Sequence, residues 1–177
     1  SRGLGDVYKR QDINSLVDSD DSILKSQFFN ILTWCWNEIC KNKDEQVILV
    51  CDEAHLIIDP NNRDGIDFLK KASKRIRKQN GSLILISQNL IDFCSPEIER
   101  YGQVIIDNSS YLFVMSQGQK EIEAVANMLS LSESERQFLT TASQGCGLFV
   151  IGQDTRLPIQ VELRVEEKEL FGSAGGK

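Results

Sequence analysis

The chain has 177 residues, of which 41% are apolar and 26% are charged, and its formal net charge is −6. These proportions are typical of a one-domain globular protein and exclude a disordered or collagen-like chain. No apolar run approaches the roughly 18 to 20 residues that span a bilayer, and no secretory signal pattern is present, so we expect no direct membrane insertion.

The two ends of the chain differ in composition from the rest. Residues 1–11 (SRGLGDVYKRQ) have no amphipathic period, and DVYKRQ resembles a translated sequencing adapter, so we interpret them as a non-native or disordered leader. A natural disordered N-terminus is the alternative. Residues 172–177 are interpreted as a flexible tail. With a foreign leader, residues 12–171 belong to a longer protein that is cut on its N-terminal side, upstream of Asp12.

Helices alternate with strands in the first half of the chain. The expected elements are a helix that begins after residues 20–22 and ends near residue 40, a strand over 47–51, a basic helix over 65–79 and a strand over 83–86. The helices follow from apolar spacings of three and four and from the stop signal Asn80-Gly81. The run VILVC has no polar residue, which predicts a first strand that is buried on both faces.

The second half adds two helices and a C-terminal antiparallel strand pair. The expected elements are strands over 103–106 and 111–115, helices over 119–129 and 133–142, and strands over 147–151 and 159–165. Ser132 followed by Glu135 is a capping-box pattern at the start of a helix. The order of elements predicts an α/β fold with a predominantly parallel sheet and an antiparallel pair at its end.

The segment VILVCDEAH, residues 47–55, has the form of a Walker B element. A buried strand delivers two adjacent carboxylates at its carboxyl end, where open α/β sheets bind ligands. In that geometry Asp52 would hold Mg²⁺ through water, and Glu53 would orient and polarise the attacking water. A strand that merely ends in an acidic turn is the alternative.

A polar pair, Ser87-Gln88, follows the next buried strand. An amide can donate to a phosphate and accept from water at the same time, which suits Gln88 to contact the γ-phosphate or the water, as a polar residue does beside Walker B in RecA-like ATPases. The alternative is a turn residue that caps the following helix.

Residues 70–78 (KKASKRIRK) carry six positive charges on an otherwise acidic chain. A guanidinium stabilises charge on a transferring phosphoryl group, so Arg75 and Arg77 are candidates for an arginine finger acting in trans, and we favour Arg77. Contact with DNA or a protein partner and a solvated helix face are the alternatives. The residues expected to contact DNA are Lys70, Lys71, Lys74, Arg75 and Lys78.

His55 is the only histidine, which excludes a histidine-rich metal site and a Ser-His-Asp triad. It either couples the nucleotide state to neighbouring segments or packs beneath the sheet edge. No GxxxxGK[ST] segment occurs, and the terminal GSAGGK is one residue short of that spacing. Either the chain is truncated upstream or it is not an ATPase.

Four segments together resemble the large ATPase of conjugative type IV secretion systems, of the FtsK and HerA group. They are CDEAHLIIDP (51–60), FLKKASKRIRKQNGSLILISQNLIDF (68–93), YGQVIIDNSSYLFVM (101–115) and LFVIGQDTRLPIQVEL (148–163). The resemblance implies a RecA-like P-loop NTPase core, truncated at its N-terminal side, in a homo-oligomer that is often hexameric. It also implies ATP and Mg²⁺ as cofactors and other secretion components as partners.

Mapped by motif, the resemblance assigns Asp52 and Glu53 to Walker B, Gln88 to the polar sensor and Arg77 to the finger. The missing P-loop implies that the chain alone does not turn over ATP, and the missing central strand implies unpaired sheet edges. Five cysteines without CxxC spacing indicate a reduced, cytosolic protein, expected at the inner face of the membrane through the full-length protein.

Three other functions compete with this interpretation. The letters DEAH also begin motif II of superfamily 2 helicases, but the Ser-Ala-Thr and QxxGRxGR elements of that class are absent. A DNA-pumping coupling ATPase shares the same catalytic layout. A non-catalytic assembly module of the secretion machine also remains open.

Overall fold

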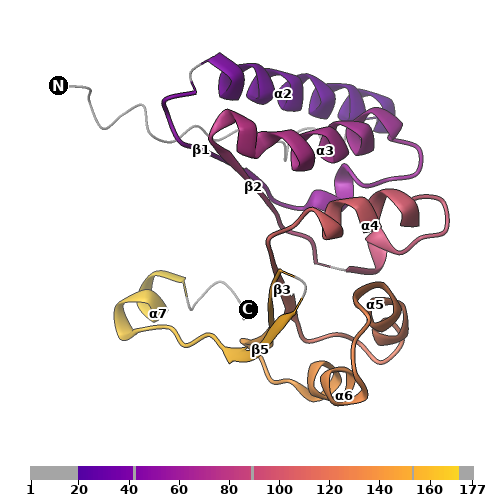
Figure 1. The fold of residues 1–177 in the computed structure, drawn as a ribbon, viewed down its shortest axis with the longest axis vertical. Helices are drawn as coiled ribbons and strands as arrows, with labels where there is room; N and C mark the ends of the chain where they lie inside the picture. Colours follow the sequence, from indigo (N-terminus) through magenta and orange to yellow (C-terminus); the bar gives the residue numbers. More distant parts are fainter. Residues whose placement is uncertain (1–19, 42, 89, 153, 172–177) are drawn as a thin grey trace. The chain divides into compact units, whose positions relative to one another are not determined.

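The computed structural model describes residues 20–41, 43–88, 90–152 and 154–171 (Figure 1). The leader and tail expected at residues 1–11 and 172–177 lie outside them. The chain divides into two compact units, and the boundary along the sequence lies between Asn108 and Ser109. No helix among the described residues is long and apolar enough to cross a membrane.

Unit 1 is built around one parallel strand pair. Its elements are α2 (Asp21–Lys41), β1 (Val47–Cys51), η2 (Ala54–Leu56), α3 (Arg63–Arg75), η3 (Ile76–Gln79), β2 (Gly81–Leu85), η4 (Leu90–Phe93) and α4 (Glu99–Asp107). The register of β1 against β2 runs from Val47↔Gly81 to Cys51↔Leu85. Since α3 connects two parallel neighbours, the segment is a βαβ unit, as the alternation of elements predicted.

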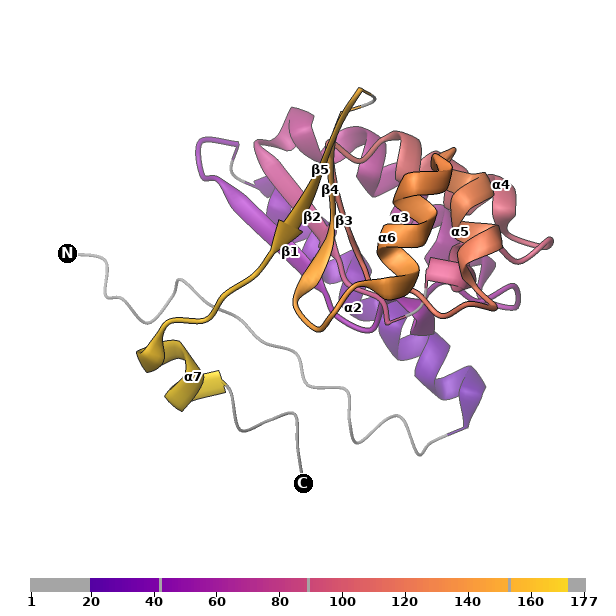
Figure 2. The same cartoon turned by 90° about the horizontal axis from the view of Figure 1, so that it is seen from below.

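The helices of unit 1 gather on one side of the strand pair (Figures 1 and 2). Alternate side chains on the other side are open to solvent, with Ile48 59%, Val50 53% and Ile84 45% exposed. The prediction that residues 47–51 are buried on both faces is therefore wrong for this structure. An apolar run shows that both faces of a strand can be buried. Whether they are buried depends on which elements cover each face of the sheet.

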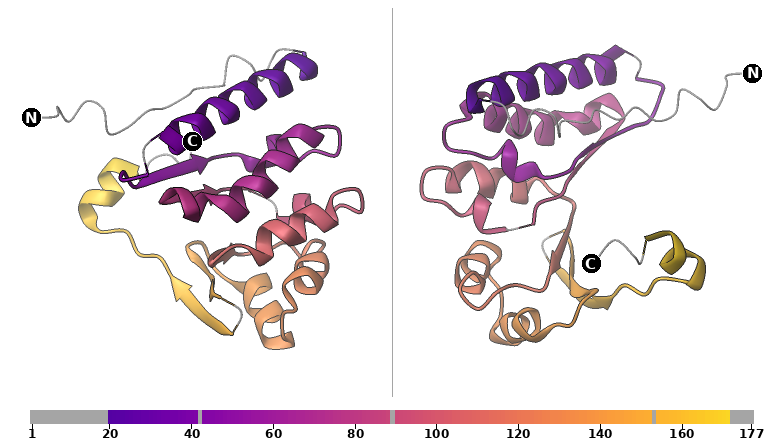
Figure 3. Two further views of the ribbon diagram at one scale, coloured as in Figure 1. Left: turned by 45° about the horizontal axis from the view of Figure 1, so that its top comes forward. Right: turned by 180° about the vertical axis from the view of Figure 1, so that it is seen from behind.

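The core of unit 1 lies between its helices and the covered face of the pair. Helices α2 and α3 lie side by side (Figure 3), with Trp36 packed edge-on against Phe68 at 6.2 Å between ring centroids. Asn62 caps α3 by accepting from the Gly65 N–H at 3.1 Å. The fully buried Leu69 shows that the apolar stripe of this basic helix faces inward, which leaves its charges outside.

Residues 103–106 are helical, so the strand predicted there is wrong. They belong to α4, which buries Gly102, Ile105 and Ile106 and whose N-cap, Ile98, is also buried. These positions follow a helical spacing, which the short apolar run VII obscures. Gly102 is required by close packing, because a Cβ at this position would lie 2.2 Å from the Phe93 carbonyl oxygen.

Unit 2 contains a three-stranded antiparallel sheet in the order β3-β4-β5. Its elements are β3 (Tyr111–Met115), α5 (Ile122–Leu129), α6 (Glu133–Thr141), β4 (Cys146–Ile151), β5 (Thr155–Gln160) and α7 (Val165–Phe171). Figure 2 shows α5 and α6 on one side of this sheet, and Val125, Leu139 and Leu148 are buried in unit 2. The predicted C-terminal antiparallel pair is confirmed, and β3 extends it by one strand. Its second strand was placed wrongly, however, because β5 pairs with β4 over Thr155–Gln160 and not over 159–165.

A hydrogen-bonded cluster connects β5 with the turn between α5 and α6. The predicted capping box is present, with the Glu135 carboxylate accepting from the Ser132 N–H at 2.7 Å. Arg156 donates to the carbonyls of Leu129 (2.7 Å) and Ser130 (3.2 Å) and to Glu135 (3.1 Å). Burial alone would raise the pKa of Glu135, but the hydrogen bonds from Ser132 and the Arg156 guanidinium outweigh it and lower that pKa.

Candidate active site

The candidate site lies at the edge of unit 1 where β1 and β2 both have their carboxyl ends. Asp52 and Glu53 follow β1 directly, and Ser87 and Gln88 come shortly after β2. Because the strands are parallel neighbours, these side chains share one rim, as the sequence predicted. This is the edge at which open α/β sheets bind their ligands.

Backbone hydrogen bonds continue the pairing beyond both strands. The Ile86 N–H donates to the Cys51 carbonyl at 2.9 Å, and the Ala54 N–H donates to the Ile86 carbonyl at 2.7 Å. The turn after β1 is thereby tied to the segment after β2. These bonds fix the separation of the two backbones on which Glu53 and Gln88 are carried.

Glu53 has a left-handed backbone conformation, with φ 52° and ψ 46°. This conformation is uncommon for a residue with a Cβ and costs free energy that the surroundings must supply. The Asp52 carboxylate accepts from the Glu53 N–H at 3.0 Å and supports the turn. Asn80 and Ser130 have the same conformation where they cap helix ends, so it is the position of Glu53 at the rim, together with this strain, that makes it a candidate functional residue.

The Glu53 carboxylate faces Gln88 on one side and His55 on the other. Gln88 Nε2 donates to Glu53 Oε1 at 2.7 Å. His55 Nδ1 lies 3.2 Å from Glu53 Oε2. The sequence is compatible with two roles for His55, and the structure places its ring beside Glu53. In the sequence, only the closeness of Glu53 and His55, with one residue between them, hints at this contact, which a tight turn then makes.

A magnesium ion could be held here only partly by protein atoms. No group of three or more potential metal-ligating side chains occurs among the described residues. Asp52 is exposed at the rim and offers a hard oxygen ligand. This donor set fits Mg²⁺, which is commonly bound through one or two carboxylates together with water and substrate phosphates.

Arg77 lies at the opposite edge of the strand pair. It is exposed in η3, which ends immediately before the amino end of β2. Five strand residues at about 3.3 Å each place roughly 16 Å of β2 between that edge and the rim that carries Glu53. The structure therefore does not bring Arg77 to the site of its own chain.

The basic residues predicted to contact DNA lie on α3 and η3. Lys71, Lys74, Arg75 and Lys78 are exposed, whereas Lys70 is half-buried, with Nζ 4.9 Å from the centroid of the Tyr101 ring. The ammonium over an aromatic face is a cation–π contact and gives Lys70 a structural role inside unit 1.

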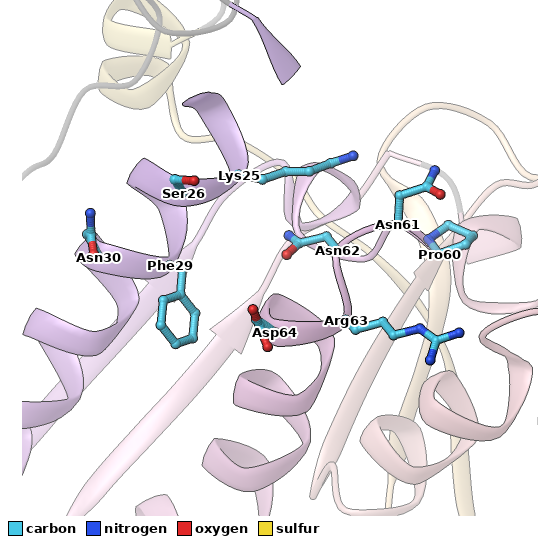
Figure 4. Close-up of a pocket in the computed structure, with 9 residues that line it drawn as sticks. All are labelled: Lys25, Ser26, Phe29, Asn30, Pro60, Asn61, Asn62, Arg63 and Asp64. Atoms are coloured by element: carbon cyan, nitrogen blue, oxygen red, sulfur yellow. The ribbon is translucent and has the colours of Figure 1, made fainter. Parts of the chain in front are cut away.

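An open hollow of about 670 Å³ lies elsewhere in unit 1, between α2 and the start of α3 (Figure 4). Its lining residues are Lys25, Ser26, Phe29, Asn30, Pro60, Asn61, Asn62, Arg63 and Asp64. None of the rim residues Asp52, Glu53 and Gln88 lines it. The hollow therefore adds nothing to the candidate site.

Three comparisons relate the chain to known proteins. The family model of the TraG P-loop domain matches residues 19–145. Protein TraC of Escherichia coli K12 is 27% identical over 106 residues, which are 59% of this chain and 12% of TraC. The solved structure of VirB4 of Thermoanaerobacter pseudethanolicus is 44% identical with a TM-score of 0.80, covering 88% of this chain and 41% of that chain.

These matches extend over the segments that form the rim. The family match includes both β1 and β2 with the residues that follow them, and the structural match confirms the α/β P-loop ATPase fold expected from the sequence. The chain spans less than half the length of either relative.

Proposed function

The chain belongs to the TraG P-loop domain family of type IV secretion ATPases, and we propose that its parent protein hydrolyses Mg²⁺-bound ATP to drive conjugative transfer or secretion. The observation that carries this proposal is the Gln88–Glu53 hydrogen bond at the carboxyl edge of the parallel pair. It joins the acidic residue after one strand to the amide after its neighbour, and so places a group that can orient water beside a group that can donate to a phosphate.

Glu53 is proposed as the residue that acts on the attacking water. Its carboxylate accepts a hydrogen bond from the water and orients it toward the γ-phosphate. Gln88 is proposed to donate to the phosphate or to that same water when ATP is present. The 2.7 Å bond between the two side chains supports this pairing of roles, because both groups then reach the same small volume.

Asp52 is proposed to hold Mg²⁺ through a water molecule. When bound, the ion neutralises charge on the phosphates. Asp52 is exposed at the rim, while its contact with the Glu53 N–H fixes the carboxylate beside the turn. The family also implies a phosphate-binding loop, and the printed sequence contains no GxxxxGK[ST] segment to provide one.

Arg77 is proposed to act on the nucleotide of a neighbouring subunit. Its position at the amino edge of β2 puts it beyond reach of Glu53 in the same chain, as required of a finger supplied in trans. This role implies a homo-oligomeric ring, which we propose to be hexameric. In a ring with ATP bound, Arg77 should face the neighbour's γ-phosphate, and an Arg77 directed away from every phosphate would contradict the role.

The parent protein is also proposed to contact DNA, other proteins and the membrane surface. The exposed Lys71, Lys74, Arg75 and Lys78 are proposed to contact DNA, and Lys70 contributes less because its ammonium lies over Tyr101. Other type IV secretion components are proposed as partners, with the parent protein at the cytoplasmic face of the membrane.

Replacing Glu53 by glutamine in the parent protein tests the proposed function. Glu53→Gln should lower kcat for ATP at least about 100-fold, because an amide cannot accept a proton from the water. The Kd for Mg·ATP should stay within about threefold of wild type, because the size of the side chain is kept. Steady-state hydrolysis and binding of a fluorescent ATP analogue measure the two quantities.

Glu99→Gln is the matched control, since it makes the same change at an exposed glutamate of α4 in unit 1. It should hydrolyse ATP like the wild type. A Glu53→Gln protein with wild-type turnover would exclude Glu53 from the reaction. A wild-type parent without any turnover would favour the non-catalytic assembly module instead.

A further inference from the structure

Glu53 needs more than its backbone to hold its carboxylate in one orientation. A glutamate side chain has three rotatable bonds, and ordering it costs conformational entropy. The exposed fraction of the Glu53 side chain is 40%, so packing alone does not fix it. If Glu53 orients the attacking water, other side chains must restrain its carboxylate.

The structure provides one restraint for each carboxylate oxygen. Gln88 donates to Oε1 from the segment after β2, and His55 faces Oε2 from η2. The left-handed backbone of Glu53 makes the second contact possible, because it turns the chain so that His55 lies beside the carboxylate. The strain at Glu53 is thereby linked to a specific side-chain contact.

Burial indicates that the contact with His55 is more than proximity. Glu53 Oε2 and His55 Nδ1 are both shielded from solvent, and neither has an aligned hydrogen bond to a described residue. Leaving two buried polar atoms unpaired is unfavourable, because neither recovers the hydrogen bond that it made to water. The two atoms lie 3.2 Å apart, so a small rotation of either side chain satisfies both at once.

We propose that His55 is a positioning residue for ATP hydrolysis, whose Nδ1–H donates to Glu53 Oε2 and holds the carboxylate toward the attacking water. The proposal rests on the proposed function of the parent protein. It assigns the ring proton to Nδ1. A carboxylate accepts at about four lone-pair sites, and Gln88 and His55 occupy two of them. The remaining sites stay available to the water.

Three substitutions at His55 in the parent protein separate positioning from packing. His55→Leu removes the hydrogen-bond donor and keeps a side chain that branches at Cγ. His55→Asn branches at Cγ like the imidazole, so its amide nitrogen can take the place of Nδ1. His55→Gln is the matched control, because it carries the same amide one bond further out. Each variant is measured for kcat, for KM of ATP and for its thermal unfolding midpoint.

The expected signature is a split between kcat and KM. His55→Leu and His55→Gln should lower kcat by about 10- to 100-fold, the usual loss when a group that orients a functional side chain is removed. Their KM should change less than about threefold, because binding of the ground state does not use this contact. His55→Asn should keep kcat within about fivefold of wild type.

Two results would overturn the role of His55 and leave the ATPase function intact. One is a wild-type kcat in His55→Leu. The other is a loss of kcat that follows the loss of the unfolding midpoint and is not rescued by His55→Asn, which would make His55 a packing residue. A wild-type parent without turnover would overturn the proposed function, and the positioning role with it.

Discussion

Glu53 in unit 1 and Glu135 in unit 2 are both partly exposed glutamates near the start of a helical segment, yet their surroundings differ. Glu135 accepts from the Ser132 N–H, the Ser132 hydroxyl and Arg156, in a helix-capping geometry without strain. Glu53 has a left-handed backbone and one aligned hydrogen bond, from Gln88. Three donors therefore meet at Oε2 of Glu135 and join α6 to β5, whereas the aligned bond at Oε1 of Glu53 comes from the other strand of the parallel pair, at the rim.

This difference separates a structural carboxylate from one that is available for chemistry. Hydrogen bonds that a fold makes permanently, such as those of a helix cap and an ion pair, stabilise it. A residue with a strained backbone reduces stability and is retained where it contributes to function. Changes at Glu135 and its partners should therefore alter stability, whereas changes at Glu53 should alter turnover.

Loss of Arg156 should reduce the stability of unit 2 more than acidification does. Arg156→Ala leaves Glu135 and the carbonyls of Leu129 and Ser130 without their donor, which should cost about 2 kcal/mol of unfolding free energy. Hydrogen exchange of the amides in α5 and α6 measures this loss. Arg164→Ala is the control, because it removes a guanidinium from an exposed position. It should change the free energy of unfolding measured by exchange by less than about 0.5 kcal/mol.

Equal exchange in the Arg156→Ala and Arg164→Ala proteins would contradict the claim that Glu135 and its partners stabilise the fold. It would show that the Arg156 cluster contributes no net stability. The surface position of Arg164 would then be energetically equivalent to the half-buried position of Arg156.

Acidification should produce a smaller effect through Glu135. Its pKa is lowered in the folded state from the usual 4.5, so the unfolded state takes up the proton first as the pH falls. The contribution of Glu135 is therefore complete above about pH 4.5 and is lost as the pH drops through the lower, folded pKa. Urea unfolding from pH 7 downward measures this dependence.

Glu135→Gln is the control for that titration, because it removes the titrating group. The difference in unfolding free energy between wild type and this variant should shrink as the pH falls below about 4.5. A difference that stays constant with pH would mean that the pKa of Glu135 is the same in the folded and unfolded states.

The sequence predicted the rim more successfully than some of the elements that surround it. Walker B and the Ser-Gln pair each follow an apolar run, and parallel pairing then brings them to one edge without further information. The capping box was equally local, since Ser132 and Glu135 carry it within one helical turn. Such features depend on residues that are close together in the sequence, and the sequence alone therefore predicts them.

Features that depend on tertiary packing were missed. The helix over residues 103–106 is fixed by burial of Ile98, Gly102 and Ile105, which a short apolar run does not reveal. The exposure of Ile48 and Val50 depends on which elements cover the sheet. The left-handed conformation of Glu53 and its contact with His55 lie next to the hydrogen bond between the Ala54 N–H and the Ile86 carbonyl, which joins residues far apart in sequence.

The most direct test of the central claim is the structure of the Glu53→Gln parent protein with Mg·ATP bound. Since the variant should bind ATP without hydrolysing it, the nucleotide should be visible intact. We expect Mg²⁺ beside Asp52 and the γ-phosphate within hydrogen-bonding reach of Gln88, about 3 Å. A nucleotide bound with its γ-phosphate away from both Asp52 and Gln88 would contradict it.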